Sequence, residues 1–227
     1  MRFINRLVLG DAKKSYAQCG EDLIANFILD ALKILKPCYL DIGAYHPTRL
    51  SNTYLLYRKG CHGVCVEPDP DLYDQIKSKR KRDVCLNVGI GTGQEAHADF
   101  YVMSSKTLNT FSKEEAERYQ SYGSERIVKV IQIPLVSVNN VIQEYFSDCP
   151  NFVSLDAEGL DRPILKTFNF SRFRPEIFCI ETLTYAEDKS ERKISEIIDL
   201  MIKEGYFVCA DTYINTIFVE KEAWTNR

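Results

Sequence analysis

The segment from residue 38 to residue 47, CYLDIGAYHP, constrains the fold of this chain more than any other. It begins as an apolar strand and stops at Asp41 and Gly43, before a polar stretch and a new helix. A buried strand that ends in Asp-x-Gly and leads into a helix is typical of α/β domains that hold a nucleotide-containing cofactor at the carboxyl ends of their strands. Glycine at this point lets a ligand approach the backbone. The segment therefore predicts a cofactor site, if the rest of the chain supplies its partners.

Apolar segments with the periods of strands and helices alternate along the chain. Strands are expected at residues 39–42, 63–67, 84–91, 97–103, 129–138, 151–156, 175–182, 206–210 and 216–220. Helices are expected at residues 21–35, 53–59, 141–146, 163–168 and 190–203, and from residue 70 into a basic run at 77–82. Several strands are apolar throughout, which is typical of a mostly parallel sheet with helices on both faces. We therefore expect a single α/β domain over residues 1–227, with an N-terminal helical segment at 1–36 and a lid or insertion at 104–128.

The composition is that of an ordinary globular protein, with 45% hydrophobic and 27% charged residues. The net charge of -3 gives no reason to expect nucleic acid or an anionic membrane as a partner. The first ten residues are interrupted by Asn5 and Arg6 and are too short for a signal peptide or a membrane span, so we expect a cytoplasmic protein. The eight cysteines lack the paired spacing of a zinc site and are expected to be reduced core residues.

Acidic residues end four separate predicted strands: Asp41, Glu67, Asp156 and Glu181. The carboxyl ends of parallel strands meet at one edge of a sheet, so we expect these side chains to converge where a ligand binds. Glu67, one strand after Asp41, is placed to accept hydrogen bonds from the ribose hydroxyls of an adenosine group. The alternative for Glu67 is a helix-capping or salt-bridged acid. Asn87 ends the next strand out, where we expect the adenine ring.

The basic run at residues 77–82, KSKRKR, follows a predicted helix. Cations at a helix C-terminus complement the helix dipole, and such a run is most often a solvated face. A phosphate-binding patch is the alternative.

Three groups of residues resemble the FkbM family of S-adenosylmethionine-dependent methyltransferases. They are the unit from Asp41 to Glu67, the strand end Asp156-Ala157-Glu158-Gly159, and the segment from Arg174 to Glu181. The sequence YAQCGED at 16–22 is similar to the stretch that often precedes that domain. The resemblance covers residues 15–220. It implies a Rossmann-like class I methyltransferase fold with a seven-stranded sheet whose last strand is antiparallel, and S-adenosylmethionine as cofactor.

The resemblance also implies a set of cofactor-binding residues, to which we add their neighbours. The expected contacts are Gln18, Asp41, Gly43, Ala44, Tyr45, Asn52, Glu67, Pro68, Asn87, Val88 and Asp156. One departure stands out, because many methyltransferases of this fold carry Gly-x-Gly where this chain has Gly43-Ala44-Tyr45. Tyr45 is therefore expected to turn away from the cofactor or to pack on it.

The family mostly methylates hydroxyl groups of sugars and natural products, so we expect a small-molecule, sugar or peptide acceptor. A hydroxyl needs a base, or a cation that lowers its pKa. His46, Asp156 and Glu158 are the candidate bases, although His46 could equally hold the turn at Pro47. Asp156, Glu158 and Glu181 could instead hold Mg²⁺, which prefers carboxylate oxygens. The alternative is that these acids bind the amino group of the cofactor or cap helices.

Two other functions stay open at this point. One is a nicotinamide-dependent oxidoreductase on the same type of sheet, which the absence of Gly-x-Gly-x-x-Gly disfavours. The other is a non-catalytic binding domain that has kept the fold. The sequence gives no indication of the oligomeric state.

Overall fold

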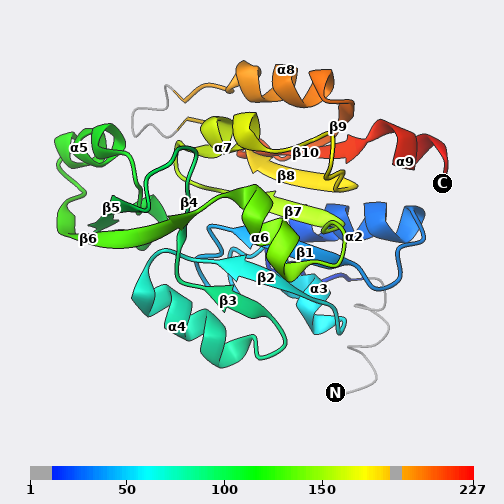
Figure 1. Cartoon of the computed structure of the whole chain (residues 1–227), viewed down its shortest axis with the longest axis horizontal. Helices are drawn as coiled ribbons and strands as arrows, with labels where there is room; N and C mark the ends of the chain where they lie inside the picture. Colours follow the sequence, from blue (N-terminus) through cyan, green and yellow to red (C-terminus); the bar gives the residue numbers. More distant parts are fainter. Residues whose placement is uncertain (1–11, 185–190) are drawn as a thin grey trace.

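The computed structural model describes residues 12–184 and 191–227, and a seven-stranded sheet forms its centre (Figure 1). The strands are β1 (Cys38–Ile42), β2 (His62–Val66), β3 (Val84–Leu86), β7 (Phe152–Leu155), β8 (Ile177–Glu181), β9 (Tyr206–Asp211) and β10 (Asn215–Glu220). Their order in the sheet is β3-β2-β1-β7-β8-β10-β9. Neighbours from β3 to β8 pair in parallel, and β10 is antiparallel to both β8 and β9. The prediction of a mostly parallel, Rossmann-like class I methyltransferase sheet with an antiparallel last strand is confirmed.

Helices cover both faces of this sheet. The helices are α2 (Glu21–Ala31), α3 (Tyr54–Arg58), α4 (Pro70–Lys79), α6 (Val138–Tyr145), α7 (Asp161–Thr167), α8 (Ser195–Lys203) and α9 (Lys221–Thr225). Alternate residues of β1 point to opposite faces: Leu40 packs in a core shared with α6, α7 and α8, and Tyr39 packs in a core shared with α2 and α3. Strands that are apolar on both faces thus divide the core into two layers.

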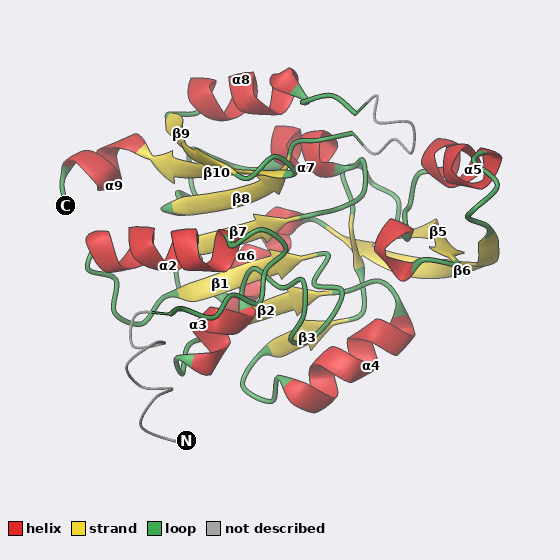
Figure 2. Cartoon of the chain, turned by 180° about the vertical axis from the view of Figure 1, so that it is seen from behind, coloured by secondary structure: helices red, strands yellow, loops and turns green. Residues whose placement is uncertain are grey.

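A second, three-stranded sheet extends from the carboxyl edge of the first (Figure 2). It contains β4 (Gly89–Ile90), β5 (His97–Met103) and β6 (Ile127–Val136), in the order β4-β6-β5. The connection from β5 to β6 carries the short helix η1 (Lys106–Leu108) and the helix α5 (Lys113–Ser121). The expected strand at 84–91 is corrected to two strands in different sheets. The chain turns between them, where the Asn87 amide donates to the backbone carbonyls of Glu67 and Pro68 at 2.9 and 2.8 Å.

Several helix boundaries also differ from those expected. The helix predicted at 21–35 ends at Ala31, Lys33 adopts a φ of 59°, and Leu35 lies beyond the helix with 90% of its surface exposed. The helix predicted at 190–203 begins at Ser195, and residues 185–190 lie outside the described part of the chain. Residues 1–11 of the expected N-terminal segment lie outside it as well.

Side chains cap α4 and α5, and the cysteines are reduced as expected, although only Cys61, Cys65 and Cys179 are buried and Cys19 is exposed. Asp69 accepts from the backbone N–H groups of Asp71 and Leu72 at the start of α4. Ser112 accepts from the N–H of Glu115 at the start of α5. All eight cysteines are free thiols. Among the described residues, no helix combines the length and the apolar character needed to cross a membrane.

Candidate functional site

A pocket of about 440 Å³ opens at the carboxyl edge of the central sheet. Its size lies in the range of small-molecule and cofactor sites. The predicted site residues that line it are Gln18, Gly43, Tyr45, Glu67, Pro68, Asp156, Glu158 and Glu181. The structure thus brings together residues that are more than 160 positions apart in the sequence. Asp41, Ala44, His46, Asn52, Asn87 and Val88 are not among the lining residues.

Glu67 forms one wall, directly after β2. One carboxylate oxygen accepts from the backbone N–H of Tyr45, and the other accepts from the N–H of Asp69, each at 2.8 Å. The side chain is thereby fixed between the loops that follow β1 and β2. Burial of Glu67 raises its pKa to about 7, against the effect of these two hydrogen bonds. The carboxylate is therefore a preorganised acceptor that titrates near neutral pH.

The loop after β1 reaches Glu67 through unusual backbone angles. Gly43 has a φ of 75°, and a Cβ atom on it would lie 1.8 Å from the carbonyl oxygen of Asp156. Only glycine fits here, because the loops after β1 and β7 touch at this residue. Tyr45 has a φ of 52°, and this left-handed turn aims its N–H at Glu67 while its half-buried side chain lines the pocket. Gly43 thus allows the loops that follow β1 and β7 to contact each other.

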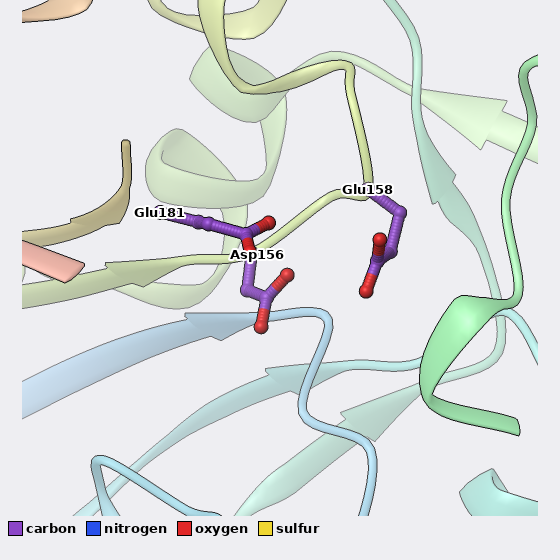
Figure 3. Close-up of side chains that lie close together, drawn as sticks. All are labelled: Asp156, Glu158 and Glu181. Carbon is purple, nitrogen blue, oxygen red and sulfur yellow. The ribbon is translucent and has the colours of Figure 1, made fainter. Parts of the chain in front are cut away.

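Three carboxylates, Asp156, Glu158 and Glu181, form the opposite wall (Figure 3). Ligand oxygens of the three lie within 4.8 Å of one another. None of the three forms an ion pair with a lysine or arginine in the part of the chain that the structure describes. We call these three residues the acidic triad.

The acidic triad has raised pKa values. Partial removal from water, followed by the charge of Asp41, raises the pKa of Asp156 to about 6, although its side chain opens onto the pocket. Burial and the charge of Asp156 raise the pKa values of Glu158 and Glu181 well above the usual range. Near neutral pH, Asp156 is therefore the member of the triad that most readily carries a charge.

The segment 106–111, from η1 towards α5, forms a third wall that the sequence did not single out residue by residue. It is fastened to the Glu67 side by Lys106 and Asn109, whose Nζ and Nδ2 atoms each donate to Oδ2 of the buried Asp69 at 3.0 Å. On the other side, the Thr110 hydroxyl donates to the carbonyl of Glu158 at 3.0 Å. The segment therefore bridges both walls of the pocket.

The predicted residues outside the lining have structural contacts. Asp41 is buried, accepts from the Thr53 hydroxyl at 2.5 Å, and lies 3.6 Å from Nη1 of the fully buried Arg80. Ala44 packs against Cys65 and Ile76. The Asn52 amide donates to the Ser154 hydroxyl at 3.1 Å.

Two more of these residues also serve the framework. Val88 packs against the main core, next to Asn87, whose amide holds the loop after β2. His46 accepts backbone N–H bonds from Thr48 and Arg49 at Nδ1, both at 3.1 Å, and burial together with the Arg49 charge lowers its pKa. His46 therefore braces the turn around Pro47.

Comparisons with known proteins relate the chain to a family. The model of the methyltransferase FkbM domain matches residues 41–208, well over half of the chain. A search of curated proteins finds no significant match.

Several solved structures resemble the chain at low identity. An O-methyltransferase from Bacillus cereus, solved in complex with S-adenosylhomocysteine, is 12% identical with a TM-score of 0.46, covering 96% of this chain and 86% of that one. A TehB-like SAM-dependent methyltransferase from Corynebacterium glutamicum is 12% identical with a TM-score of 0.43, covering 97% of both chains. The 1,6-didemethyltoxoflavin-N1-methyltransferase from Burkholderia thailandensis is 10% identical with a TM-score of 0.41, covering 96% of this chain and 84% of that one.

The family match extends from Asp41, in β1, to Val208, in β9, and so includes the two walls built by Glu67 and the acidic triad as well as the segment between them. It favours a methyltransferase over a nicotinamide-dependent oxidoreductase. The chain therefore belongs to the FkbM family of S-adenosylmethionine-dependent methyltransferases.

Proposed function

We propose that the protein transfers a methyl group from S-adenosylmethionine to a hydroxyl group of a sugar or another small natural product. The observation that carries the proposal is the shared pocket, in which a fixed ribose acceptor faces a cluster of carboxylates with raised pKa values. The pocket lies where ligands bind in open α/β sheets, at the carboxyl ends of the strands.

The lining residues fit the proposed cofactor. Glu67 would accept hydrogen bonds from the two ribose hydroxyls, because each of its oxygens keeps a lone pair beyond the backbone N–H that it already accepts. Leu72, Ile90 and Leu108 supply apolar surface in the pocket, which suits the adenine ring. The negative charge of Asp156 suits the cationic methionine end. Asp41, Asn87 and Val88 stay predicted contacts, and in our proposal they support the loops around the cofactor.

Asp156 is our proposed general base. S-adenosylmethionine, when bound, supplies an electrophilic methyl group, and the acceptor oxygen takes it as the carbon–sulfur bond breaks. The acceptor hydroxyl must lose its proton in this step, and the Asp156 carboxylate can take it, because a pKa of about 6 leaves it ionised at neutral pH but more basic than an ordinary aspartate. Glu158 is the alternative candidate base, but its pKa is raised further, so less of its ionised, proton-accepting form is present at neutral pH. His46 faces the backbone, so we assign it no proton transfer.

Mg²⁺ at the acidic triad is a second way to activate the hydroxyl. Three carboxylate oxygens within 4.8 Å of one another match the hard oxygen ligands that this ion prefers. The two routes differ in their response to chelation. Full activity after exhaustive treatment with EDTA supports Asp156 as the base, whereas loss of activity that Mg²⁺ restores supports the metal.

The test uses the purified full-length chain, methyl-labelled S-adenosylmethionine and a panel of sugars, glycans and hydroxylated natural products. Mass spectrometry of the products should identify an O-methylated acceptor. Asp156→Asn should lower kcat by about 10²–10⁴-fold at saturating cofactor, because the proton acceptor is lost. Cofactor binding without transfer to any oxygen acceptor would contradict the proposed acceptor class, and no cofactor binding at all would point to a non-catalytic domain.

A further inference from the structure

Basic residues precede three neighbouring strands at the edge of the sheet opposite the pocket. Strands β3, β2 and β1 are adjacent and parallel, so their amino ends share one edge. The exposed cations just before these ends are Lys33 and Lys36 before β1, Arg58 and Lys59 before β2, and Lys79, Lys81 and Arg82 before β3. We call these seven residues the basic edge. It includes three of the five cations of the run at residues 77–82, which we expected to be a solvated face.

The basic edge is electrostatically unpaired. None of its seven cations lies within ion-pairing distance of a carboxylate among residues 12–184 and 191–227. The other half of the same edge is mixed in charge, because Asp148 precedes β7 while Arg172, Arg174 and Glu176 precede β8. A net charge of -3 therefore conceals a local concentration of positive charge on an acidic protein.

Tyrosine rings support two arginines of the basic edge. The Arg82 guanidinium lies 3.9 Å from the centre of the Tyr57 ring and donates to the Tyr57 carbonyl. Arg58 donates to the Tyr16 hydroxyl at 3.1 Å. The rings of Tyr16 and Tyr54 meet edge to face at 4.9 Å, and Tyr54 stacks on Tyr57 at 5.9 Å. Stacked guanidinium groups keep N–H donors free for phosphate oxygens, whereas the covered rings are poor platforms for nucleobases.

One apolar side chain is exposed within the basic edge, and a second is exposed on the adjoining helix α2. Leu35, between Lys33 and Lys36, is 90% exposed, and Phe27 on α2 is 62% exposed. Lys59 donates to the side chain of Asn26, which is on the same helix as Phe27, and Figures 1 and 2 place the ends of α2 and α3 at this edge. Apolar side chains among lysines suit the boundary of a lipid bilayer, where the chain enters the interface and the cations meet the headgroups. Nucleic acid offers no comparable apolar phase for a leucine.

We propose that the basic edge docks the protein onto a bilayer that contains anionic phospholipids. Docking in this orientation leaves the pocket, at the opposite edge of the sheet, open to acceptors. The proposal revises the expectation from net charge that no membrane is involved, and it does not depend on the methylated substrate.

The test is cosedimentation of the full-length protein with vesicles. The protein should bind vesicles of phosphatidylcholine with about one third phosphatidylglycerol, and should bind phosphatidylcholine alone weakly. Lys36→Glu combined with Lys81→Glu should lower the partition coefficient at least about tenfold, because each surface cation contributes severalfold. Both side chains are exposed without a bonded partner, so the fold should persist, which circular dichroism checks.

The matched control combines Lys166→Glu and Lys203→Glu on α7 and α8, two exposed lysines whose reversal gives the same net charge. This control should leave vesicle binding within about twofold of the original chain. Leu35→Ser should weaken the part of the binding that survives high salt. Equal loss in both double variants would overturn the proposal, since net charge alone would then explain it. Binding to a single-stranded RNA oligonucleotide without binding to anionic vesicles would overturn it as well.

Discussion

Glu67 illustrates how single residues build this site, because its carboxylate is held by the N–H groups of Tyr45 and Asp69 before any ligand arrives. We predict that Glu67→Gln raises the Kd for S-adenosylhomocysteine about 10–100-fold. The amide lacks the charge, and one end of it must present a donor to a backbone N–H. Isothermal titration calorimetry measures this change.

Glu176→Gln changes a half-buried acid at the other edge of the sheet. This variant is the control and should bind S-adenosylhomocysteine normally. An unchanged affinity in Glu67→Gln would remove Glu67 from the cofactor site.

The pKa of Glu67 predicts how cofactor binding depends on pH. Burial raises this pKa to about 7, and the ribose hydroxyls donate to the ionised form. Affinity for S-adenosylhomocysteine should therefore rise as the pH increases through about 7 and level off above it, with release of a proton on binding below that pH. Titrations in buffers of different ionisation enthalpy detect the proton. The dependence should be absent in Glu67→Gln, and a pH-independent affinity of the original chain would contradict the mechanism.

The place of a residue in the structure can be predicted where its position along a strand decides that place. Glu67, Asp156, Glu158 and Glu181 line one pocket because each stands at or just after the end of a parallel strand. Asp41 follows the same rule in sequence, yet it faces the buried Arg80. Arg80 comes from the basic run that we expected to be solvated. A cation inside a run of exposed cations carries no local signal of burial, so this ion pair could not be predicted from the pattern.

At the scale of elements, the connection between β5 and β6 depends on Asn109. The Nδ2 of Asn109 donates to Asp69, and its Oδ1 accepts from the N–H of Met103 at 2.8 Å. We predict that Asn109→Ala loosens residues 104–126 and speeds their amide hydrogen exchange about tenfold or more, because a hydrogen bond to a buried carboxylate is lost. Mass spectrometry localises the exchange.

A second asparagine provides the control for that experiment. Like Asn109, Asn139 uses both ends of its amide: it donates to the backbone carbonyl of Thr167 and accepts from the N–H of Asn169, but it lies on α6 away from the pocket. Asn139→Ala should speed exchange near α6 and leave residues 104–126 unchanged. Equal loosening of residues 104–126 by both substitutions would mean that Asn109 has no special role in holding the third wall.

Helices and strands could be predicted from the sequence where apolar residues form a long, uninterrupted pattern. The buried strands β1, β2, β7 and β8 were located within one or two residues. The second sheet was not foreseen, because β4 has only two residues and pairs with β6, more than 40 positions away. Such pairing depends on tertiary contacts, which leave no periodic pattern of apolar residues in the local sequence. The bridging role of residues 106–111 was hidden for the same reason, and the lid assignment of residues 104–128 stays a prediction.

At the scale of the whole molecule, charge is divided between the two edges of the sheet. In the described part of the chain, acids without ion-pair partners gather at the carboxyl edge as the acidic triad, and cations without ion-pair partners form the basic edge. Sites that concentrate like charges cost folding stability, which proteins accept where function requires it. The triad should therefore be a local source of instability in the ligand-free protein.

We predict that Glu181→Gln stabilises the ligand-free protein at pH 8 by about 1 kcal/mol, or about 2–4 °C in Tm. Burial and neighbouring acids raise the Glu181 pKa, so its contribution to stability is present below the unfolded-state pKa and is lost as the pH rises through the folded-state value. Glutamine mimics the neutral acid, so its advantage should shrink towards pH 5.

Glu222→Gln, at an exposed position on α9, is the control for this stability measurement and should change Tm little. If the triad binds Mg²⁺, the ion should raise the Tm of the original chain and have less effect on Glu181→Gln. A lower Tm for Glu181→Gln at pH 8 without the ion would show that the triad is held by favourable contacts instead of being strained by its charge.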